Sequence, residues 1–105
     1  MVTLVLNAPT SRERANGAKS FDGILATGVG PGYAIASTLV GRLTPGCSVV
    51  VLNKERHCRA EGTLVRLEPK ERTASGMQRY DVWIRDLRRT AYHPEALNRC
   101  GVAVL

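Results

Sequence analysis

The apolar residues of this chain come in short runs that glycine or proline interrupts, and this pattern most constrains its fold. The run at residues 2–6 precedes Pro9, and the runs at residues 47–52 and 102–105 each follow a glycine. Such runs are typical of strands that end in turns. A bilayer span needs about 18 apolar residues, and the first residues carry no basic region ahead of their apolar stretch. We therefore expect a cytoplasmic protein without a membrane span.

Alternation marks two further strands. Residues 62–67 set Thr63, Val65 and Leu67 against Leu64 and Arg66, and residues 79–85 alternate strictly between two faces. In an extended strand successive side chains point to opposite faces. One face of the second strand should therefore lie in the core, and it consists of Tyr80, Val82 and Ile84. The opposite face then carries Arg79, Asp81, Trp83 and Arg85.

One helix is predicted over residues 33–43, because Ile35, Leu39 and Leu43 recur at every fourth position. Thr44, Pro45 and Gly46 should end it. With 105 residues the chain is near the commonest domain size, so we expect a single domain over residues 1–105. The predicted fold is α+β, a small antiparallel, partly open β-barrel of about five or six strands with one main helix. A flat α+β sheet covered by one helix is the alternative.

The charge balance favours nucleic acid as a partner. Fifteen lysines and arginines stand against nine acidic residues, a net charge of +6, and twelve of the fifteen are arginine. Guanidinium groups bind phosphate in a bidentate manner and stack on bases. A basic surface that only keeps the protein in solution would produce the same composition. We expect non-catalytic binding of RNA or single-stranded DNA.

Trp83 is the centre of the predicted nucleic-acid site. It is the only tryptophan, and Arg79 and Arg85 flank it on the same strand face. Bases of single strands stack on aromatic rings while arginines contact phosphates. Four more arginines should contribute from a hairpin tip and from the end of the strand, namely Arg56, Arg59, Arg88 and Arg89. Alternatively, Trp83 packs under a loop or covers one end of the barrel.

A second candidate site is the glycine-rich segment at residues 28–32. Its spacing, Gly-x-Gly-x-Gly, fits neither the dinucleotide-binding pattern nor the Walker pattern. Gly28, Gly30, Gly32 and Tyr33 could still line a ligand pocket, or the segment could be a plain loop. The alternative function is therefore a domain that binds a small ligand or a protein partner. Under this alternative the protein could also be a homo-oligomer whose end strands pair between subunits.

Catalytic and metal-binding patterns are not evident. The candidate ligands and nucleophiles show no Cys-x-x-Cys or His-x-x-x-His spacing, and they are Cys47, His57, Cys58, His93 and Cys100. Structural zinc sites use closely spaced pairs, and an odd number of scattered cysteines suits a reducing compartment. We expect no metal and no cofactor. Nothing in the spacing selects a catalytic triad, so an enzyme is not predicted.

A family resemblance adds to this interpretation. Residues 43–52 read Leu-Thr-Pro-Gly-Cys-Ser-Val-Val-Val-Leu, and residues 60–67 read Ala-Glu-Gly-Thr-Leu-Val-Arg-Leu. Over about 25 residues this resembles the middle of PUA-like barrels of the ASCH and EVE type. Those families usually have an acidic residue where this chain has Cys47. The resemblance implies an RNA or modified-base pocket between barrel and helix, with Gly28, Gly30, Gly32 and Tyr33 near its mouth.

Overall fold

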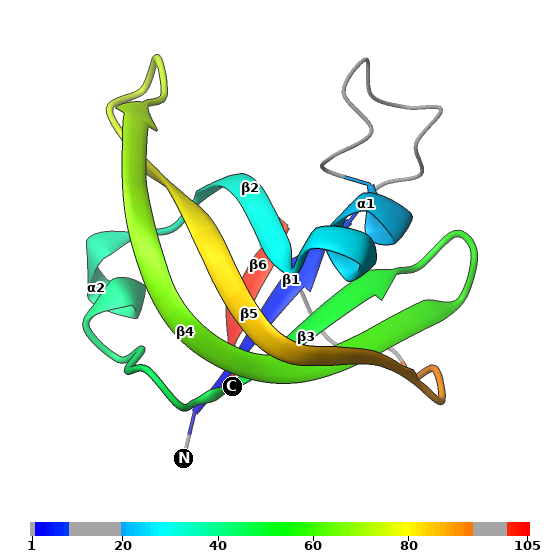
Figure 1. Cartoon of the computed structure of the whole chain (residues 1–105). Helices are drawn as coiled ribbons and strands as arrows, with labels where there is room; N and C mark the ends of the chain where they lie inside the picture. The colour runs from blue at the N-terminus through cyan, green and yellow to red at the C-terminus, as the bar shows by residue number, and fades with distance from the viewer. Residues whose placement is uncertain (1, 9–19, 94–100) are drawn as a thin grey trace.

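The computed structural model describes residues 2–8, 20–93 and 101–105. Six strands form one sheet in the order β2-β5-β4-β3-β1-β6, which curls into an open half-barrel (Figure 1). The strands are β1 (Thr3–Asn7), β2 (Val29–Ala34), β3 (Ser48–Asn53), β4 (Cys58–Arg72), β5 (Gln78–Thr90) and β6 (Val102–Val104). The helices are α1 (Phe21–Thr27) and α2 (Ser37–Val40). The prediction of a small, β-rich, partly open fold is confirmed in outline.

The sheet is mixed, so the predicted all-antiparallel arrangement is wrong at one pair. β1 and β3 run parallel, with Thr3 opposite Ser48 and Asn7 opposite Leu52. The two strands are buried on both faces, which explains their continuous apolar runs. β6 pairs with β1 in antiparallel fashion, so the two end strands pair within the chain.

The predicted helix over residues 33–43 is also wrong. Tyr33 and Ala34 belong to β2 and lie opposite Tyr80 and Arg79 of β5. Only residues 37–40 are helical. The fourfold spacing of Ile35, Leu39 and Leu43 suits a helix, but pairing with β5 holds the start of this segment in an extended conformation, and tertiary pairing overrides a weak local preference.

The longer helix is α1, in a segment for which no helix was predicted. The Ser20 hydroxyl accepts a hydrogen bond from the N–H of Gly23 at 3.1 Å, and it begins the helix. Gly28, with φ 74°, ends it and donates to the carbonyl of Ile24 at 2.8 Å. Serine and glycine at these places are a readable capping signal. Neither helix in the described part of the chain is long and apolar enough to cross a membrane.

β4 and β5 form the long bent hairpin that shapes the molecule (Figure 1). They extend well beyond the strands predicted at residues 62–67 and 79–85, and β4 includes Pro69. The pairing register shifts at three places along the hairpin, and such bulges bend and twist a sheet. At the first bulge Asp86 has φ 55° and lies near Gly62. An added Cβ on Gly62 would lie 2.6 Å from the Ile84 side chain, so only glycine fits there.

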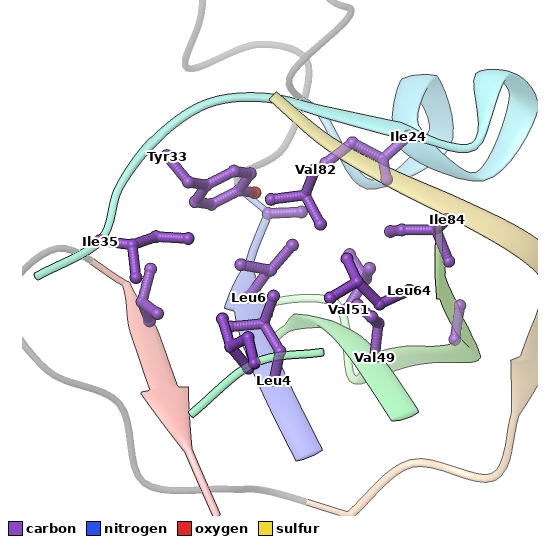
Figure 2. Close-up of a cluster of buried hydrophobic side chains, with 14 of the residues drawn as sticks. Leu4, Leu6, Ile24, Tyr33, Ile35, Val49, Val51, Leu64, Val82 and Ile84 are labelled. Carbon is purple, nitrogen blue, oxygen red and sulfur yellow. The ribbon is translucent and has the colours of Figure 1, made fainter. Parts of the chain in front are cut away.

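The core fills the concave side of the curled sheet (Figure 2). Leu4, Leu6, Val49 and Val51 meet side chains of β4, β5 and α1 there. Val82 and Ile84 are buried as predicted, and Tyr80 packs partly buried against the same cluster. Across the open side, the Tyr33 hydroxyl donates to the carbonyl of Asn7 at 2.7 Å. This bond joins edge strand β2 to β1 and narrows the opening of the half-barrel.

Candidate nucleic-acid interface

The convex side of the β4–β5 hairpin, which we call the outer face, holds part of the predicted site. Residues directly opposite in a sheet share a face. Trp83 lies opposite Arg66, Arg85 opposite Thr63, and Arg88 opposite Glu61. Val82 and Ile84, the neighbours of Trp83, point into the core. The structure thus brings five of the seven predicted residues to one face, of which Arg59 is buried: Arg59, Arg79, Trp83, Arg85 and Arg88.

Trp83 is half-buried and already has polar partners. Its indole N–H donates to Oε2 of Glu68 at 3.2 Å. The guanidinium of Arg66 lies over the ring, 4.3 Å from its centre. Arg66 itself is 55% exposed, so water reaches this stacked pair. Because the planar Arg66 guanidinium stacks on the Trp83 ring, this ring face can also accept another planar, electron-poor group.

A charge network extends from Trp83 along β4. Lys70 lies 2.9 Å from Glu68 and 3.5 Å from Asp81. The hydrogen bond from Lys70 lowers the pKa of Glu68, and the same bond raises the pKa of Lys70. Both groups therefore stay charged at neutral pH. The charges of Arg66, Glu68 and Lys70 alternate in sign at every second residue. This pattern indicates such a network, and the sequence analysis missed it.

Arg79 has a structural partner. It donates to the carbonyl of Gly32 at 2.8 Å, while Asp81 accepts from the N–H of Gly32 at 3.0 Å. The two side chains together fix the edge strand β2 to β5. Arg79 is therefore less available to a ligand than Arg85 and Arg88.

Arg85 and Arg88 are exposed. Within the described residues neither forms an ion pair. Arg88 borders an open hollow of about 620 Å³ at the bulge, whose other lining residues are Glu61, Gly62, Thr63, Asp86, Leu87 and Thr90. These two arginines are the outer-face cations that remain available for phosphate.

Arg56 and Arg89 lie elsewhere, at α1 on the concave side. Both pair with Asp22 of α1 at 3.2 Å. Arg89 also lies over the ring of Phe21, with its guanidinium carbon 5.2 Å from the ring centre. One carboxylate thus partly neutralises two of the predicted phosphate contacts. The predicted seven-residue surface is divided between two sides of the sheet.

Arg59 is buried, with a side chain only 6% exposed. Its Nε donates to Oε2 of Glu61 at 2.9 Å, and its Nη1 donates to the carbonyl of His93 at 3.1 Å. The hydrogen bond from Arg59 lowers the pKa of Glu61. This guanidinium is a structural group, and it lies outside the surface that a phosphate can reach.

Gly28 ends helix α1, and the rest of the glycine-rich segment belongs to strand β2. Pro31 lies at a register shift in this edge strand, where its missing N–H is tolerated. The carbonyl of Gly28 accepts from the N–H of Ile84 at 2.7 Å. Both backbone groups of Gly32 bind β5 side chains. Gly30 is buried beside the Tyr33 ring. The backbone groups that a ligand would use at Gly28 and Gly32 are thus engaged inside the protein.

The cysteines and histidines of the described residues do not form a cluster. Cys47 is buried and Cys58 is partly exposed, while Cys100 lies outside the described residues. Within the described ranges no group of three or more His, Cys, Asp and Glu side chains could hold a metal ion. His57 stacks on Tyr92 with ring centres 5.0 Å apart.

Comparisons with protein-family models, curated proteins and solved structures find no match to this chain. The PUA-like resemblance therefore stays a prediction.

Proposed function

We propose that this domain binds single-stranded nucleic acid, RNA or DNA, without catalysis, across the outer face of β4 and β5. One observation carries the proposal: Arg85 and Arg88 are exposed without an acidic partner in the described chain, on the same face as the Arg66–Trp83 stack. Surfaces that bind single strands usually combine cations, which contact phosphates, with an aromatic ring on which bases stack.

The Arg66–Trp83 pair supports stacking. Arg66 is more than half exposed, and its ion pair with Glu68 is long, at 3.7 Å, so moving its side chain off the ring breaks only a weak surface ion pair. A base would then take its place on Trp83, and the displaced guanidinium would stay close enough to pair with a neighbouring phosphate. Stacking of one base on an aromatic ring contributes about 1–3 kcal/mol.

The alternative, a small-ligand or partner-binding domain, receives less support. It rested on Gly28, Gly30, Gly32 and Tyr33, and these residues have internal structural roles. The alternative also included a homo-oligomer in which the end strands pair between subunits. In the structure β1 and β6 pair with each other within one chain. The outer face therefore becomes the first surface to test.

The test is a titration of Trp83 fluorescence with short single-stranded RNA and DNA at two salt concentrations. Anisotropy of a labelled oligonucleotide serves as a second signal. We expect quenching and binding that weaken with salt. Replacing Arg85 with Gln should reduce the salt dependence by about one phosphate contact. Arg42→Gln, the same change at an exposed arginine between α2 and β3, is the matched control.

No change in emission or anisotropy at micromolar protein, after removal of copurified nucleic acid, would exclude the proposed function. Binding that Arg42→Gln weakens as much as Arg85→Gln would place the interaction away from the outer face. That result would point to an unspecific effect of net charge.

A further inference from the structure

The hollow beside the bulge of β4 and β5 contains two opposite charges that do not neutralise each other. Asp86 and Arg88 both line it, and these two described side chains form no ion pair with one another. Both are exposed. A carboxylate and a guanidinium at one hollow fit a ligand that offers hydrogen-bond donors and acceptors on adjacent edges.

The third charge in the hollow is already engaged. Glu61 accepts through Oε2 from Arg59 at 2.9 Å and from the Thr90 hydroxyl at 3.3 Å. With two carboxylates and one accessible guanidinium, the hollow disfavours a free phosphate, which the carboxylates would repel. A neutral group with polar edges fits better.

The bulge fixes the position of Asp86. Its φ of 55° places it in the left-handed region, which few residues other than glycine adopt and which Asp and Asn tolerate best. Gly62 keeps the opposite strand close, because a Cβ there would lie 2.8 Å from the carbonyl oxygen of Arg85. The carboxylate therefore stands on a rigid backbone, as a specific contact requires.

We propose that this hollow binds a guanine base, with Asp86 accepting from N1–H and the N2 amino group and Arg88 donating to O6 and N7. Among the common bases, guanine alone presents two adjacent donors next to two adjacent acceptors. Both contacts can then be bidentate. Cytosine presents one amino group, and adenine and uracil alternate donors with acceptors.

This inference rests on the proposed function and reassigns Arg88 from a phosphate contact to a base contact. A single strand held by Arg85 and the Trp83 face would deliver the base to the hollow. Free guanine nucleotides carry the same edges and are the second source of this chemistry. The experiment must therefore separate a base in a strand from a base in a mononucleotide.

The experiment measures the affinity of the full chain for labelled uridine hexamers that carry one central guanosine, adenosine or cytidine. Guanosine should bind about tenfold more tightly than the others, as expected for one good bidentate contact. Inosine, which lacks the amino group, and 7-deazaguanosine, which lacks N7, should each lose most of that preference. Calorimetric titration with GMP is run in parallel.

Two conservative variants assign the contacts. Asp86→Asn keeps the size and the backbone conformation but loses the carboxylate, so guanosine and inosine should become equivalent. Arg88→Lys keeps the charge but loses the bidentate contact, so 7-deazaguanosine should match guanosine. Thermal unfolding at the same midpoint as the parent chain shows that each variant is folded. If guanosine keeps its advantage in both folded variants, the site assignment is wrong.

The remaining outcomes separate the two proposals. Salt-sensitive binding with equal affinity for the guanosine, adenosine and cytidine hexamers overturns the guanine site and leaves the proposed function in place. Binding of GMP that requires Asp86, without binding of any oligonucleotide, supports the guanine site and overturns the nucleic-acid function. Absence of binding to oligonucleotides and to GMP overturns both.

Discussion

Two groups of exposed arginines lie on opposite sides of the curled sheet, and they differ in how they are neutralised. On the concave side, Arg56 and Arg89 share the carboxylate of Asp22. On the outer face, Arg85 and Arg88 form no ion pair within the described chain. The same residue type thus has two roles. Composition measures the number of arginines, but only their surroundings decide which of them can bind phosphate.

The largest expected effect comes from Gly62, which allows the bulge behind the outer hollow. Its Cβ would lie 2.6 Å from Cγ2 of Ile84 and 2.8 Å from the carbonyl oxygen of Arg85. We expect Gly62→Ala to lower the free energy of unfolding by about 3 kcal/mol, as overpacking does, measured by urea denaturation.

Gly41→Ala is the matched control for that substitution. Gly41 has φ −62°, and its Cβ would meet its nearest neighbour, the carbonyl oxygen of Ser37, at 3.7 Å. Alanine should change stability there by less than about 1 kcal/mol. Equal losses in the two variants would show that the close approach at Gly62 is not what makes glycine necessary.

The second prediction compares the two arginine groups directly. Arg85→Gln with Arg88→Gln should weaken oligonucleotide binding about tenfold, since two exposed charge contacts are lost. Arg56→Gln with Arg89→Gln removes the same charge, and it should change affinity by less than about threefold. Anisotropy titrations at one salt concentration make the comparison. A larger loss in the concave-side variant would reverse the assignment of the faces.

The third prediction tests whether pairing with Asp22 is what keeps Arg56 and Arg89 from binding single strands. Asp22→Asn removes the carboxylate that Arg56 and Arg89 share, so the concave side gains accessible positive charge. We expect affinity for single strands to rise by about two- to threefold and the salt dependence to steepen. Unchanged binding would mean that position on the sheet, rather than pairing with Asp22, keeps these arginines out of the interface.

The smallest effect is a pH dependence at Glu61. The hydrogen bond from Arg59 lowers the pKa of Glu61 below its ordinary value of 4.5. A lowered carboxyl pKa stabilises the folded state above the unfolded-state pKa, and this contribution is lost as pH falls through the folded-state pKa. Because the Glu61 side chain is 46% exposed, we expect less than about 1 kcal/mol.

Thermal unfolding between pH 3 and pH 7, about the range in which carboxyl groups titrate, measures this contribution. Glu61→Gln should be less stable than the parent chain at neutral pH, and the difference should shrink as the solution becomes acidic. A difference that stays constant with pH would show that the ionisation of Glu61 does not contribute.

Sequence reasoning located the strands better than the helices. Five predicted strands overlap with observed ones, at residues 2–6, 47–52, 62–67, 79–85 and 102–105. Strands can be found in the sequence because the burial of one or both strand faces sets which neighbouring residues are apolar. The helix over residues 33–43 was misplaced because strand pairing with β5 is a long-range interaction. The caps of α1, Ser20 and Gly28, were present in the sequence and would have located that helix.

The candidate site was predictable to a similar extent. Alternation along β5 placed Arg79, Trp83 and Arg85 on one face, and the structure confirms this placement. No local pattern could show that Asp22 lies beside Arg56 and Arg89, 34 and 67 residues further along the chain. Nor could it show that Arg59 is buried against Glu61. Asp86 was missed because its left-handed backbone conformation belongs to the bulge, which forms only when β4 and β5 pair.

The sequence by itself determined a small β-rich chain, its buried strand faces and its excess of arginine, because local periodicity and composition contain that information. The tertiary structure alone decided the parallel pairing of β1 with β3, the bulge at Gly62 and the partner of each arginine. These features depend on contacts between residues far apart in the chain, where packing and backbone pairing outweigh local preference. The division of the arginines between two faces, on which the proposed function depends, belongs to this second group.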